Sequence, residues 1–125
     1  MEKYNLDGID LVLWDEADAL KRVIGKQEIL KVLVAFFLSD MPVYAKALSD
    51  ELAQKDMQAA AKSAHALKGV AGNLSTLALA EIVKRIELAC RESAPLEELL
   101  RCHSVFEDIF SKTCAVLSSW QVSQH

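Results

Sequence analysis

The sequence predicts an all-α protein, an antiparallel, up-and-down four-helix bundle with a short extra helix near the N-terminus. Three observations lead to this fold class. The composition is 52% apolar but only 6% aromatic, with four glycines and two prolines, which favours helices over sheets. Apolar residues recur at helical spacing through most of the chain. The breaks between these segments are short, and short connections make neighbouring helices antiparallel.

The 125 residues are expected to form one domain, because a chain of this length can bury a core without disulfides or metal ions. An N-terminal segment, residues 1–15, precedes the helices. Leu6 to Asp10 has the residue types of a turn, and the apolar run at 11–14 is expected to lie across one end of the bundle. The helical bundle is predicted over 16–118, and residues 119–125 are predicted to fray.

Two helices are predicted in the first half of the bundle. Asp15 caps a short helix over 16–24. A long helix follows over 27–54, in which Pro42 produces a kink. The alternative is a helix split before Asp40, which would then be the N-cap of the second piece; one kinked helix is favoured. Helical spacing predicts an inward face for the long helix made of Ile29, Leu33, Phe36, Phe37, Val43, Tyr44, Ala47, Leu48 and Leu52.

Three further helices complete the predicted bundle. Asp56 caps the third helix, which ends near Gly72 and Asn73. Ser75 is expected to cap the fourth helix. The run Ser93-Ala94-Pro95 marks the next break, because proline is favoured in the first turn of a helix. The last helix then continues to the end of the predicted bundle.

Composition and charge exclude several classes of function. The net charge of −4 and the pI near 5.3 argue against a nucleic-acid or membrane-surface role. The N-terminus lacks a signal-peptide pattern, and no stretch is long and apolar enough to insert into a membrane. The three cysteines, Cys90, Cys102 and Cys114, are interpreted as reduced thiols, which predicts a cytoplasmic protein without a metal site. We expect it to be monomeric.

The third predicted helix carries the candidate functional residue, His65. An apolar stripe on this helix is formed by Ala60, Ala64, Leu67, Ala71 and Leu74. His65 lies about 100° off that stripe. Its flank holds two lysines and three small residues, namely Ala61, Lys62, Lys68, Gly69 and Gly72. The lysine charges disfavour the imidazolium, and a neutral imidazole suits reversible attack on phosphorus. The small residues would let a partner approach closely, although Gly72 could instead be the helix C-cap.

Glu87 is the candidate for orienting the histidine. In an antiparallel hairpin of the third and fourth helices, residues whose numbers sum to about 151 or 152 lie level, which places Ile86 and Glu87 beside His65. A carboxylate that accepts a hydrogen bond from Nδ1–H would leave Nε2 as the nucleophile. The carboxylate also favours the imidazolium, so it opposes the lysines. Lys84 and Arg85 are expected to add to the positive rim of the site.

The run Ala64-His65-Ala66-Leu67-Lys68-Gly69-Val70-Ala71-Gly72-Asn73-Leu74 resembles the signature of the histidine-containing phosphotransfer (HPt) domain, a His-x-Leu-Lys-Gly motif in a four-helix bundle. The resemblance extends more loosely over 16–118. It implies that His65 is the phosphorylated residue and that Lys68 and Gly69 are the matching motif residues. The acidic or amide residue that the family places on the next helix falls on Glu87. Ser75 departs from the family, which often has glycine there.

The resemblance implies a phosphocarrier of a His–Asp relay. His65 would accept a phosphoryl group from a receiver-domain aspartate and pass it to another receiver. The chain shows no nucleotide-binding loop, so it would bind no cofactor itself, and the partner receiver would supply Mg²⁺. The docking surface is predicted at Ala61, Lys62, Gly69 and Gly72, with apolar neighbours from the second helix. The sequence leaves open whether the carrier is free-standing or the C-terminal module of a hybrid sensor histidine kinase.

Helical bundles of this size also serve two other functions. The first is a helical protein-interaction module in which His65 is never phosphorylated, and a phosphorylation experiment separates it from the carrier. The second is a metal-binding carboxylate bundle. That fold needs paired Glu-x-x-His motifs on its helices, and the sequence contains none. The phosphocarrier is therefore the favoured function, with the interaction module as the alternative.

Overall fold

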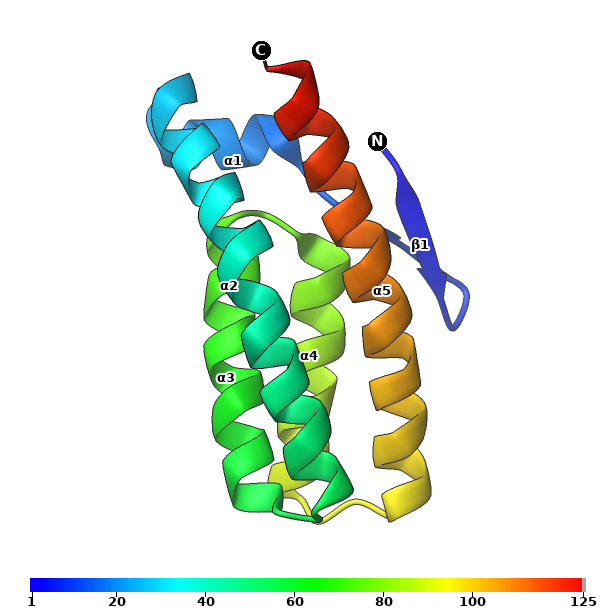
Figure 1. Cartoon of the computed structure of the whole chain (residues 1–125). Helices are drawn as coiled ribbons and strands as arrows, with labels where there is room; N and C mark the ends of the chain where they lie inside the picture. Colours follow the sequence, from blue (N-terminus) through cyan, green and yellow to red (C-terminus); the bar gives the residue numbers. More distant parts are fainter. Residues whose placement is uncertain (125) are drawn as a thin grey trace.

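The computed structural model describes residues 1–124, so that His125, in the predicted frayed tail, lies outside the described residues. The elements are β1 (Lys3–Leu6), β2 (Ile9–Val12), α1 (Glu16–Arg22), α2 (Gln27–Ala53), α3 (Met57–Asn73), α4 (Leu77–Arg91) and α5 (Leu96–Ser123). In Figure 1 the four long helices α2 to α5 run alternately up and down, and α1 crosses one end of the bundle. The predicted all-α bundle with a short extra helix is therefore confirmed.

The core lies between the four long helices. Its largest fully buried side chains include Phe37, Leu48, Leu67, Ile86 and Phe106. All five members of the predicted apolar stripe of α3 are buried, which fixes the orientation of that helix about its axis. The flank of α3 that carries His65, about 100° from this stripe, therefore faces outward. No described helix is both long and apolar enough to cross a lipid bilayer.

The inward face of α2 differs from the predicted one. Phe37, Leu48 and Leu52 are buried as expected, but the buried stripe also contains Leu30, Val34, Met41 and Ala45. Four residues predicted to be inside, Ile29, Phe36, Val43 and Tyr44, are exposed. The prediction was wrong because α2 carries apolar residues on two of its faces. The helix is continuous over Gln27–Ala53, so the alternative split is also wrong, and Pro42 lies on its exposed side.

The N-terminal segment forms a β-hairpin that the sequence analysis missed. β1 and β2 pair antiparallel, with Lys3 opposite Val12 and Leu6 opposite Ile9. Asp7 and Gly8 form the turn with φ angles of 53° and 84°, as a two-residue hairpin requires. The hairpin packs against α4 and α5 (Figure 1). The apolar run at 11–14 is divided: Leu11 and Val12 belong to β2, and Leu13 and Trp14 follow it and are buried.

The C-terminal end of α5 is ordered as a helix to Ser123, so the prediction that the tail frays from residue 119 was wrong. Trp120 is buried and its ring packs edge-on against Trp14, with 5.4 Å between the ring centroids. Its Nε1–H donates to Glu16 Oε2 at 3.0 Å. The tail is therefore held by residues from the other end of the chain.

The turn between α3 and α4 is built differently from the prediction. Asp15 and Asp56 cap α1 and α3 as expected, but α1 ends at Arg22, two residues early, and Thr76 replaces Ser75 as the N-cap of α4. Ser75 instead takes a left-handed φ of 61°, in the position where helices usually end with glycine. Its hydroxyl donates to Asp18 Oδ2 at 2.6 Å, which joins α1 to this turn. Gly72 is within α3 and is not the C-cap.

Candidate functional site

His65 projects from the outer flank of α3, near the middle of the helix. Its side chain is 66% exposed, whereas its neighbours Ala64 and Leu67 on the stripe are buried. Nε2 of the ring forms no hydrogen bond with any described residue, and Nδ1 lies 3.0 Å from Glu87 Oε2. The ring is therefore anchored through one nitrogen and presents the other to solvent.

Glu87 on α4 is the centre of the site. Oε1 accepts a hydrogen bond from Lys68 Nζ at 2.6 Å. Oε2 accepts from Arg91 Nε and Nη2 at 3.1 and 2.9 Å, in addition to its contact with His65. The predicted juxtaposition of Glu87 and His65 across the α3–α4 pair is present. One carboxylate thus joins the imidazole to two cations.

These contacts determine the ionisation of Glu87. The hydrogen bond from Lys68, with a further contribution from Arg91, lowers the pKa of the Glu87 carboxyl from 4.5 to about 2, although burial acts in the opposite direction. Glu87 is therefore ionised at neutral pH and can only accept hydrogen bonds. The proton in its contact with the ring must be on Nδ1 of His65, which leaves the lone pair of the neutral ring on Nε2.

Arg91 is a residue of this site that the sequence analysis missed. It lies one helical turn after Glu87, and the only signal for it was the spacing of an acid and a base at i and i+4. Arg85, which was predicted to lie on the positive rim, does not contribute there. Its guanidinium pairs instead with Glu81 at 3.0 Å and with Asp7 at 3.1 Å.

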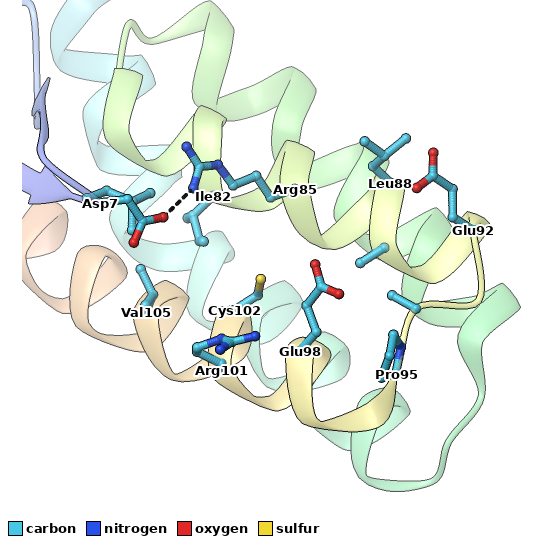
Figure 2. Close-up of a pocket in the computed structure, with 13 residues that line it drawn as sticks. Asp7, Ile82, Arg85, Leu88, Glu92, Pro95, Glu98, Arg101, Cys102 and Val105 are labelled. Atoms are coloured by element: carbon cyan, nitrogen blue, oxygen red, sulfur yellow. Dashed lines mark hydrogen bonds and ion pairs between the residues drawn. The ribbon is translucent and has the colours of Figure 1, made fainter.

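Arg85 lines a groove of about 650 Å³ between α4 and α5, which the hairpin turn closes at one end. Figure 2 shows Asp7 bonded to Arg85 at that end, with Arg101, Glu98 and Cys102 extending from α5. Apart from Arg85, none of the residues predicted for the site lines this groove. The groove is thus separate from the site around His65.

The four residues predicted to contact a partner have different surroundings. Lys62 and Gly69 are exposed and Gly72 is half-buried. A Cβ added to either glycine would meet no atom within 4 Å, so internal packing does not require glycine there. Glycine inside a helix costs about 1 kcal/mol relative to alanine, and packing within the chain does not account for that cost at Gly69.

Ala61 departs from the prediction of an exposed contact residue, because it is only 4% exposed. It lies against α4, where it lines a cavity of about 410 Å³ together with Lys62, Cys90 and Arg91. Lys62 forms no ion pair with a described residue, in contrast to Lys68, which is held by Glu87. Of the two lysines flanking His65, one is therefore bound in the resting site and the other points to solvent.

The described residues contain no group of three or more His, Cys, Asp or Glu side chains that could hold a metal ion. The three cysteines are free, and burial raises the pKa of each thiol. Raised pKa values make thiols less reactive at neutral pH. At neutral pH the three thiols are therefore protonated, including Cys90, which lines the same cavity as Lys62 and Arg91.

Comparison with known families decides the family of the chain. A family model described as the Hpt domain matches residues 32–115, which is more than half of the sequence. The chain belongs to the Hpt domain family. The matched region contains all of α3 and α4, and with them His65, Lys68, Glu87 and Arg91. The hairpin and α1 lie outside it.

Two solved structures of Hpt proteins have a similar fold. The HPT domain of an Hpt sensor hybrid histidine kinase from Shewanella is 18% identical, with a TM-score of 0.79 over 90% of this chain and 96% of that chain. Histidine-containing phosphotransfer protein B from Pseudomonas aeruginosa is 21% identical, with a TM-score of 0.81 over 89% and 96% of the two chains. No curated protein matches the sequence.

Membership of the Hpt family has a functional meaning. Hpt domains are phosphocarriers without a kinase site of their own, and they interact with receiver domains in phosphorelays. The family therefore supports a phosphotransfer role for this chain.

Proposed function

We propose that this Hpt domain carries a phosphoryl group on Nε2 of His65. It accepts the group from the aspartate of one receiver domain and passes it to the aspartate of another. The observation that carries this proposal is the contact between Nδ1 of His65 and the ionised Glu87, which leaves an exposed Nε2 with a free lone pair. A nucleophile with its tautomer fixed in this way needs no base to activate it.

The transfer joins chemical groups from two proteins. Nε2 attacks the phosphorus of the acyl phosphate, the N–P bond forms, and the aspartate carboxylate leaves with the electron pair of the broken O–P bond. The receiver supplies Mg²⁺ and its acidic pocket, and this chain supplies the nucleophile. Lys68 is close enough to turn from Glu87 toward the transferred group, whose negative charge it would compensate.

The docking surface surrounds His65 on α3 and extends onto α2. Glu51 of α2 accepts a hydrogen bond from Ser63 of α3 at 2.6 Å, which fixes the register of the two antiparallel helices. Tyr44, seven residues before Glu51, is then level with Val70, seven residues after Ser63. The exposed side chains of Val43 and Tyr44 thus lie near the glycines that follow His65. They provide apolar contact area beside the bare helix backbone.

The charge of this surface suits an acidic partner. Lys62, Lys68 and Arg91 gather around His65, although the chain as a whole has a net charge of −4. The acidic pocket of a receiver domain is complementary to such a basic patch, and complementary charge speeds encounter. We propose that the chain acts in the cytoplasm as a monomer and binds no cofactor of its own.

Incubation with a radiolabelled, phosphorylated receiver tests the proposal. Label is expected on the native chain as an acid-labile, base-stable phosphate, and His65→Gln should remove it without changing the helical circular dichroism. His103→Gln is the matched control. Nε2 of His103 lies 2.7 Å from Ser49 Oγ, so it is already engaged in the packing of α2 and α5. Stable binding of the receiver with no label on the native chain would instead support the interaction module.

A further inference from the structure

The proton on Nδ1 decides how a phosphoryl group leaves His65. If Nδ1 carries a proton, the P–N bond breaks, its electron pair returns to Nε2, and a neutral imidazole is released. If Nδ1 has lost its proton, the leaving group is an imidazolate, which is a far stronger base and a poor leaving group. When Nδ1 is protonated, no net proton transfer is needed, because its proton stays on the ring while the phosphoryl group is accepted and while it is passed on.

We propose that Glu87 keeps Nδ1 of His65 protonated while Nε2 carries the phosphoryl group, so that the loaded carrier stays ready for transfer at neutral pH. The inference rests on the proposed function, since it concerns the phosphorylated state of the same ring. It goes beyond the orientation of the ring before phosphorylation. An amide at this position would orient the neutral ring equally well, but it would stabilise the phosphorylated imidazolium much less than a carboxylate does.

The surroundings of Glu87 hold its carboxylate in place for this role. Its side chain is only 10% exposed, and both oxygens are bonded, one to Lys68 and the other to Arg91 and His65. Ile86 and Cys90 on the same helix are buried, so α4 cannot rotate Glu87 away from α3. Because an ionised carboxylate is only an acceptor, the 3.0 Å contact with the ring exists only while Nδ1 bears a proton.

Some of the other charges near the ring weaken the binding of the Nδ1 proton, and others strengthen it. Lys62 and Lys68 on α3, and Arg91 on α4, disfavour a positive charge on the ring. Lys68 and Arg91 are already paired with Glu87, which reduces their effect on the ring. The phosphoryl group itself favours the imidazolium. Removal of the Glu87 charge would leave the two cations uncompensated, so the proton on Nδ1 would be held less tightly.

The test compares the phosphorylated native protein with phosphorylated Glu87→Gln, which keeps the shape and loses the charge. Inorganic phosphoramidate is the phosphodonor, and proton–nitrogen NMR follows the ring nitrogens of His65 against pH. The pKa of the phosphorylated ring should be at least about one unit higher in the native chain, which is about tenfold in proton affinity. Glu81→Gln, on the same helix but paired with Arg85, should match the native protein.

A second measurement needs no variant. In the native phosphoprotein, the Nδ1–H signal of His65 should persist above neutral pH, and the rate of transfer to a receiver should fall only when that signal is lost. Equal pKa values in native and Glu87→Gln phosphoproteins would overturn the inference, as would a deprotonated Nδ1 in the native phosphoprotein near neutral pH. Absence of phosphate from Nε2 of His65 would instead refute the proposed carrier function.

Discussion

Replacing Glu87 by glutamine is expected to destabilise the fold at neutral pH and much less in acid. The pKa of Glu87 is lowered from 4.5 to about 2, which at about 1.4 kcal/mol per pKa unit corresponds to a free energy of roughly 3 kcal/mol. Lys68 and Arg91 are 36% and 55% exposed, so water screens part of this interaction. We therefore expect a loss of about 1 to 3 kcal/mol of unfolding free energy.

The pH dependence follows from the direction of the shift. Because the pKa of Glu87 is lower in the folded protein, its contribution is complete above about pH 5 and is lost as the pH falls toward about 2. Urea unfolding followed by helical circular dichroism should therefore show a gap between native and Glu87→Gln proteins that is largest near neutral pH and narrows by about pH 3. A gap that stays constant or widens in acid would refute the assignment of this network.

The matched control is Glu81→Gln, six residues earlier on α4. Glu81 pairs with Arg85 at i and i+4, and both side chains remain about one third exposed. A helix-surface pair of this kind contributes about 0.5 kcal/mol or less. The control should therefore change the unfolding free energy far less than Glu87→Gln. Equal losses in the two variants would mean that the Glu87 network has no special role in stability.

Three further substitutions test separate parts of the structure. Gly69→Leu should leave the unfolding free energy unchanged or raise it by up to about 1 kcal/mol, and should slow transfer from a phosphorylated receiver at least about tenfold. Transfer at the native rate would contradict the proposed docking surface. Trp120→Ala should lower the unfolding free energy by about 3 kcal/mol or more, and a loss under about 1 would show that the tail is not held as described. Ser75→Ala should lower the unfolding free energy by about 1 kcal/mol, because the backbone keeps its left-handed conformation but loses the hydrogen bond to Asp18. A gain in stability would show that this hydrogen bond does not stabilise the turn.

The register of α3 and α4 was predictable because their connection is short. Only three residues separate Asn73 from Leu77, so the level of each residue on α4 follows from the position of the turn. Glu87 could therefore be placed beside His65 before the fold was known. The contact of Arg91 depends on side-chain geometry that helical spacing does not determine, and for this reason it was missed.

Features that depend on distant residues escaped the sequence analysis. Four-residue strands are marginal by themselves, and the hairpin here depends on residues far along the chain: Leu6 is buried in the core, and Asp7 pairs with Arg85, 78 residues later. The Asp7-Gly8 turn was a usable signal for it. Trp120 looked like part of a frayed tail because its partner Glu16 lies 104 residues away. Helix α2 carries apolar residues on two faces, and helical spacing alone does not determine which of the two is buried.

The most direct test of the account is to identify the atom that carries the phosphate. The protein is loaded from a phosphorylated receiver, and NMR coupling between phosphorus and the ring nitrogens is recorded with native and His65→Gln proteins. Phosphate is expected on Nε2 of His65 alone, with Nδ1 facing Glu87 and no phosphate on the variant. Phosphate on Nδ1 of His65, or on His103 or another residue, would contradict it.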